Sequence, residues 1–192
     1  LAETDDTLIS LDNMQGLIGI DPDKKQATCW AGTKLDALGP ALHAQGLAMQ
    51  NLGDIDKQAI AGVLGTGTHG SGITFGVIPN QVVGIRMIDG KGEIHDLTEA
   101  DGDTFKAAQV SLGALGIITQ ITLQCEPAYR LKRVRKRDSL EATLNNIDQH
   151  LANNRNFEIL YWFPYSDQCT YQTLNYTQEP AKEDSSWKYV VD

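Results

Sequence analysis

The stretch that decides the fold reads Asn51-Leu52-Gly53-Asp54-Ile55 and, four residues later, Ile60-Ala61-Gly62-Val63-Leu64-Gly65-Thr66-Gly67-Thr68-His69-Gly70-Ser71-Gly72. It places six glycines between Gly53 and Gly72 and interleaves them with threonine, serine and histidine. Because glycine has no Cβ, backbone N–H groups can approach a ligand closely there, and the hydroxyl groups add donors. Such an array of fixed donors suits a pyrophosphate. The residues alone also allow a tight glycine-rich turn that holds no ligand.

Two familiar phosphate-binding motifs do not explain this stretch. Residues 65–70 match G-x-G-x-x-G, and Asp89 follows about 20 residues later, as the ribose ligand of a Rossmann domain would. That motif must open a helix, however, and Gly72 and Pro79 would interrupt one. A P-loop needs Gly-Lys-Ser/Thr, and here the last glycine of the match is followed by serine and glycine. A dinucleotide would therefore be held in another way.

Residue periodicity around this stretch predicts a mixture of strands and helices. Apolar runs predict strands over residues 7–11, 26–30, 82–89, 93–97 and 117–125, with Gly90-Lys91-Gly92 as a hairpin turn. Leucines at positions 35, 38 and 42 predict a helix that begins at a capping box of Thr33 and Asp36 and ends at Gly46. Another helix is predicted over residues 103–110.

The composition changes after Glu126-Pro127. Residues 130–137 form a basic run that would suit nucleic acid or a membrane, but their alternation with apolar residues favours a half-exposed strand with a solvated face. An amphipathic helix with Leu140, Leu144, Ile147 and Leu151 on one face is predicted next. Strands are predicted over 157–163 and 169–176, followed by a polar, flexible segment over 178–186.

Composition narrows the classes of function. With 16 Lys and Arg against 25 Asp and Glu, the formal charge is −9, so we expect no nucleic-acid partner. No apolar run approaches the ~20 residues of a membrane-spanning helix, and we expect a cytoplasmic or peripherally membrane-associated protein. Cys29 and Cys125 lie in apolar runs and are predicted to be buried thiols. Because the chain begins at Leu1 rather than Met, we interpret it as part of a longer protein.

The glycine-rich stretch resembles the second half of the vanillyl-alcohol-oxidase (PCMH) type of FAD-binding domain, and within it the sugar-1,4-lactone oxidases. Residues 111–119 are similar to that family's later flavin-contacting strand, and residues 157–164 to the start of its substrate domain. The resemblance implies an α+β fold: an FAD-binding domain with a mixed sheet and flanking helices over 1–127, then the start of an α+β substrate (cap) domain over 128–192. FAD is the implied cofactor.

The resemblance also implies which residues contact FAD. These are Gly53, Asp54, Ile55, Ala59, Gly62, Thr66, Gly67, Thr68, His69, Gly70 and Ile118. The loop at Gly53 would pass the flavin ring, and Ala59 and Gly62 would lie at a short helical turn packed on the cofactor. Residues 66–69 would line the pyrophosphate and ribityl chain, and the backbone of Ile118 would face the adenine half.

No catalytic residue and no metal ligand is predicted. His69 is expected to orient its loop and donate to the cofactor, because the flavin-linking histidine of the family lies in a Gly-His-Ser motif before the first predicted strand. His43, His95 and His150 lack a partner cluster in the sequence and are interpreted as surface or structural residues. The Arg, Glu and Lys residues that act on substrate in the family lie near its C-terminus, outside these residues.

The resemblance implies hydride transfer from a CH–OH group of a sugar lactone to the flavin. Reoxidation by oxygen would then give hydrogen peroxide, and the small Gly53 favours oxygen because a bulkier residue there hinders it in relatives. The implied partners are therefore a sugar lactone or alditol and oxygen. Three alternatives stay open: an alditol oxidase, an FAD-dependent lactone dehydrogenase that uses another acceptor, and a non-catalytic FAD-binding module.

Overall fold

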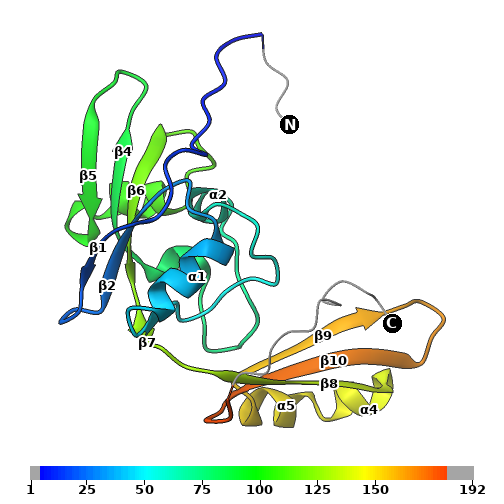
Figure 1. Ribbon diagram of the computed structural model, residues 1–192. Coiled ribbons are helices and arrows are strands. Elements are labelled where there is room, and N and C mark those ends of the chain that lie inside the picture. The colour runs from blue at the N-terminus through cyan, green and yellow to red at the C-terminus, as the bar shows by residue number, and fades with distance from the viewer. Residues whose placement is uncertain (1–4, 181–192) are drawn as a thin grey trace. The chain divides into compact units, whose positions relative to one another are not determined.

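The chain folds as two compact units, Leu1–Ala128 and Tyr129–Asp192, in a computed structural model that describes residues 5–180 (Figure 1). Helices and sheets occur in both units, which confirms the predicted α+β class. A mixed sheet was expected, but all strand pairings within residues 5–180 are antiparallel. Three of these pairings join strands that follow each other along the chain through short turns, which can link only antiparallel neighbours.

A five-stranded sheet forms the centre of the first unit. Its order is β1 (Leu17–Asp21), β2 (Gln26–Trp30), β6 (Ile117–Gln124), β4 (Val82–Ile88) and β5 (Ile94–Thr98). Four of these strands and the β4–β5 hairpin were predicted. The strand expected over 7–11 is wrong: Leu8 and Ile9 are 69% and 60% exposed, and these residues join no sheet in the described part of the chain. An apolar run without a pairing partner does not become a strand, and β1 takes that edge instead.

Short helices accompany this sheet. They are α1 (Leu35–His43), α2 (Ile60–Gly65), α3 (Asp103–Gln109) and the 3-10 helices η1 (Ile78–Gln81) and η2 (Glu99–Asp101). Figure 1 shows α1 and α2 on the same side of the sheet. The capping box predicted for α1 is wrong, because Lys34 is the N-cap and the Thr33 hydroxyl donates to the carbonyl of Trp30 at 2.6 Å. The helix ends at His43, and Gly46 (φ 71°) lies beyond its C-cap.

The core of the first unit lies between the sheet and these helices. It draws on alternate residues of β2, β4 and β6 and on the predicted leucines of α1, which are all buried. Cys29 and Cys125 are 0% and 3% exposed, so their predicted burial is confirmed. A two-residue pairing of β3 (Leu47–Ala48) with β7 (Glu126–Pro127) lies apart from the main sheet.

The second unit is a three-stranded sheet with helices along one face (Figure 1). Its order is β8 (Leu131–Ser139), β10 (Gln168–Tyr176) and β9 (Asn156–Trp162). The single amphipathic helix predicted here is wrong: Asn146 separates α4 (Leu140–Asn145) from α5 (Ile147–Asn153). Three of its four apolar residues still pack on the small core, whereas Leu144 is 46% exposed.

Strand β8 is basic, as predicted, but neither of its faces is buried. Residues 132–138 are all exposed, because the small core of the second unit is built from β9, β10 and the two helices and includes no residue of β8. From residue 181 onwards, the segment expected to be flexible (178–186) lies outside the described residues. None of the helices within residues 5–180 is long and apolar enough to span a bilayer.

Candidate functional site

The glycine-rich stretch folds into two loops on either side of α2. We name residues 50–55 the first loop and residues 66–72 the second loop. The first turn of α2, between the two loops, is hydrogen-bonded to the segment that precedes α1. The N–H groups of Ile60 and Ala61 donate to the carbonyls of Thr33 (2.8 Å) and Ala31 (3.1 Å). No helix follows the second loop until the 3-10 turn η1, so the prediction that this stretch is not a Rossmann motif is confirmed.

The two loops touch backbone to backbone. A Cβ at Gly70 would lie 2.0 Å from the carbonyl oxygen of Leu52, a distance that no side chain tolerates. At Gly53 a Cβ would lie 3.3 Å from both the carbonyl oxygen of His69 and Cγ2 of Thr68. Two of the predicted glycines therefore serve the approach of one loop to the other.

Gly67 has a separate, structural role at the end of α2. Its φ of 64° is in the left-handed region, its N–H donates to Leu64 O at 3.0 Å, and the N–H of Thr68 donates to Val63 O at 2.9 Å. These two bonds form a Schellman motif, in which glycine is the favoured residue. The motif brings the hydroxyls of Thr66 and Thr68 to 3.3 Å from each other, and Thr66 is exposed.

The structure brings together all of the predicted cofactor residues except Ile118. Asp54, Ile55, Gly62 and His69 are exposed in the two loops and α2, and Ala59 is the N-cap residue of α2. Because a carbonyl oxygen can only accept, Nδ1 of His69 donates to Gly70 O at 3.1 Å, which agrees with the predicted loop-orienting role. Ile118 lies on β6, paired with Met87, and its side chain is 7% exposed in the core.

An apolar rim around these loops was missed by the sequence reasoning. Leu52, Ile73, Val110 and Leu112 are between 41% and 78% exposed. Residues 110–116, which we name the third loop, join the site because Leu112 N–H donates to Gly65 O at 3.1 Å. Exposed apolar residues beside glycine backbone and threonine hydroxyls suit a ligand with a flat apolar ring and a polar linker. Of these four residues only Leu112 lies in residues 111–119, where only a resemblance was noted.

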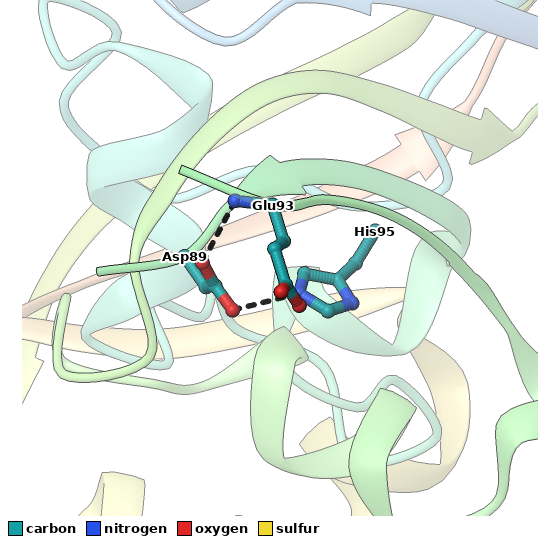
Figure 2. A group of neighbouring side chains, drawn as sticks. All are labelled: Asp89, Glu93 and His95. Carbon is teal, nitrogen blue, oxygen red and sulfur yellow. Dashed lines mark hydrogen bonds and ion pairs between the residues drawn. The ribbon is translucent and has the colours of Figure 1, made fainter. Parts of the chain in front are cut away.

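His95 has partners that the sequence did not reveal. At the β4–β5 turn, Asp89 accepts from the N–H groups of Lys91 (2.8 Å) and Glu93 (3.0 Å), and its second oxygen lies 3.0 Å from Nε2 of His95 (Figure 2). The prediction that His95 lacks a partner cluster is therefore wrong. The pairing of β4 with β5 brings residues 89 and 95 together, and the resulting network closes the hairpin.

This network predicts the titration of Asp89. Hydrogen bonds from His95, and from the N–H groups of Glu93 and Lys91, hold the pKa of the Asp89 carboxyl below its ordinary value. A lowered pKa contributes stability above the unfolded value of about 3.9, and that stability is lost as the pH falls through the folded value. We expect carboxyl NMR to show Asp89 titrating below 3.9 and His95→Ala to raise its pKa. The control His43→Ala should leave the pKa of Asp89 unchanged. If His95→Ala also leaves it unchanged, this account of the network is contradicted.

Comparison with known proteins agrees with this geometry. Residues 1–98 match the family model described as FAD binding domain, and residues 121–192 match that of D-arabinono-1,4-lactone oxidase. The L-gulono-1,4-lactone dehydrogenase of Mycobacterium tuberculosis is 38% identical over 191 residues, which cover 100% of this chain and 44% of that protein. The L-gulonolactone oxidase of Bos taurus is 36% identical over 188 residues, covering 97% and 42%.

A solved structure shows the same fold at low sequence identity. Cholesterol oxidase from B. sterolicum superposes with a TM-score of 0.77 at 17% identity, covering 86% of this chain and 34% of that one. Fold and site thus define an FAD-binding protein of the predicted PCMH type. The chain belongs to the FAD binding domain family, and FAD is its cofactor. Its sequence is similar to the lactone oxidases and dehydrogenases, and it spans 44% and 42% of the length of the two relatives above.

Proposed function

We propose that the whole protein is an FAD-dependent oxidoreductase that oxidises the CH–OH group of an aldonolactone such as D-arabinono- or L-gulono-1,4-lactone. One observation carries the proposal: the two loops in backbone contact around α2 lie within the match to an FAD-binding family. The match to a lactone oxidase family in the following residues supports the substrate class.

The residues of the site fit the chemical parts of FAD. The hydroxyl of Thr66 donates to Gly62 O at 3.1 Å, so the hydroxyl of Thr68 beside it is the one that would donate to the pyrophosphate. The exposed Gly62 would let the cofactor approach α2. The apolar rim residues Leu52 and Leu112 would cover apolar parts of the ring and exclude water from it. FAD, when bound, supplies the hydride-accepting chemistry. These residues would hold and orient it.

Oxygen is the electron acceptor that we propose, with hydrogen peroxide as the product. The absence of a side chain at Gly53 supports this choice, because glycine leaves more room for oxygen beside the flavin than a bulkier residue would. A lactone dehydrogenase that uses another acceptor is the second candidate. It is favoured by the relative at 38% identity, whose name is that of a dehydrogenase.

Reduction of the flavin by substrate tests the proposal. We expect the whole protein to lose its flavin absorbance near 450 nm when an aldonolactone is added without oxygen. The flavin absorbance should return when air is admitted, with one molecule of hydrogen peroxide formed per molecule of lactone oxidised. If the absorbance returns only with an artificial electron acceptor, the dehydrogenase is favoured. Xylitol serves as the comparison substrate for alditol oxidation. A flavin that no lactone bleaches would contradict the proposed activity.

A further inference from the structure

Two buried amide side chains stand out in the first unit. Asn51 and Gln81 are 6% and 5% exposed, and with Thr33 they are the buried polar side chains of this unit within residues 5–180. A buried amide needs hydrogen-bond partners, because an unsatisfied polar group destabilises the folded state. The hydrogen-bond partners of these two amides therefore indicate their structural role.

Gln81 bonds two neighbouring residues of the first loop, Gln50 and Asn51, through both ends of its amide. Its Oε1 accepts from the N–H of Gln50 at 2.9 Å, and its Nε2 donates to the carbonyl of Asn51 at 2.9 Å. Residues 51–53 are in neither a helix nor a strand. The Gln81 side chain therefore acts as a two-point partner for that segment, as a neighbouring strand would.

Gln81 is the last residue of the 3-10 turn η1. This turn and Asn51 also hold the second loop. Nδ2 of Asn51 donates to the carbonyl of Ser71 at 2.9 Å. The N–H of Ile78, at the start of η1, donates to the carbonyl of Thr68 at 2.8 Å. One short turn, η1, is thus bonded to the first loop through Gln81 and to the second loop through Ile78.

We infer that Gln81 is a positioning residue of the FAD site, which sets the first loop against the second loop although it is itself buried. The inference rests on the proposed role of the two loops in binding FAD. Because Gly70 and Gly53 already bring the loops into backbone contact, a small shift of residues 50–53 would change the surface offered to the cofactor. Loss of Gln81 should therefore weaken FAD binding more than an equal loss of hydrogen bonds elsewhere in the unit.

Gln109 provides the matched control. Its Nε2 donates to the carbonyls of Pro79 and Val82, both at 3.1 Å, so Gln109→Met also removes two side-chain hydrogen bonds to backbone in the first unit. Pro79 lies in η1, so this variant loosens the same turn, but neither bond reaches the first or second loop and the two bonds of Gln81 stay in place. We expect Gln81→Met to raise the FAD dissociation constant at least tenfold and to change the circular dichroism of bound flavin. Gln109→Met should stay within twofold, although both variants lower the melting temperature of the apoprotein.

Two further measurements separate the inference from the proposed function. Gln81→Glu keeps the acceptor for Gln50 N–H but buries a charge and sets an oxygen against the carbonyl of Asn51, so its dissociation constant should be at least as high as that of Gln81→Met. Amide exchange in the apoprotein should quicken over residues 50–53 and 69–71 in Gln81→Met only. If wild type binds FAD and Gln81→Met matches Gln109→Met in affinity and spectrum, the inference is overturned. If exchange responds as expected but wild type takes up no FAD, the failure lies in the proposed function, and the assignment of Gln81 to an FAD site falls with it.

Discussion

Replacing Gly70 with alanine is expected to abolish FAD binding by the chain. The new Cβ would lie 2.0 Å from Leu52 O, 3.0 Å from Leu52 C and 3.0 Å from Nδ2 of Asn51. Because the first two of these atoms belong to the backbone, no rotamer change relieves the clash and the two loops must separate. We expect the FAD dissociation constant to rise by about a hundredfold or more, measured by quenching of flavin fluorescence on titration.

A second glycine supplies the control for this substitution. Gly39 lies inside α1, away from the loops, and a Cβ there would meet no atom within 4 Å in the described part of the chain. Gly39→Ala should bind FAD as wild type does; Pro40 follows this position, so crowding of the new Cβ against the proline ring offsets the helix propensity of alanine. A Gly70→Ala chain that is folded by circular dichroism yet binds FAD within threefold of wild type would show that the loop contact is not needed.

Local patterns were sufficient to predict most of the sheet. The β4–β5 hairpin could be predicted from its Gly-Lys-Gly turn between apolar runs, and burial alternates along β2. In β6 burial alternates only from Ile121 onwards, because the pairing with β4 shifts register between Ile118 and Gln120. The amino acids of the candidate site were also visible as a glycine-rich stretch. What the stretch could not show is which atom each glycine faces: Gly70 approaches Leu52, 18 positions away, and Gly67 terminates a helix.

Two of the errors share a physical cause, which is that distant partners decide among local options. The hydroxyl of Thr33 could have capped α1 but accepts from Gly16 N–H at 2.9 Å, 17 residues away. Leu8 and Ile9 look like a strand and find no sheet to join within residues 5–180. Gln81 carried no local signal at all, because its partners lie 30 and 31 residues earlier in the chain.

Cys29 is expected to be almost inert towards thiol reagents while the first unit is folded. Burial raises its pKa to about 12, with the nearby Cys125 as a second cause, and burial raises that of Cys125 to about 11. Only the thiolate reacts, and an unperturbed thiol has a pKa of about 8.5. At pH 8 the folded protein should therefore hold the Cys29 thiolate at roughly a thousandth of its population in urea, and reaction with DTNB should slow at least as much. Rapid labelling of native protein would contradict the packing described for β2.

The same reaction reports on FAD binding without reference to activity. If Cys29 reacts only when the first unit opens, a ligand that binds the folded unit lowers the labelling rate by the factor 1 + [FAD]/Kd, about a hundredfold at 100 times Kd. Cys169, 2% exposed in the core of the second unit, is an internal control, because FAD held by the first unit's loops alone should not slow its labelling. Peptide mapping after timed labelling separates the two sites. Equal slowing of Cys29 and Cys169 would mean that the cofactor stabilises both units, whereas no slowing at Cys29 would contradict a site built from the first and second loops.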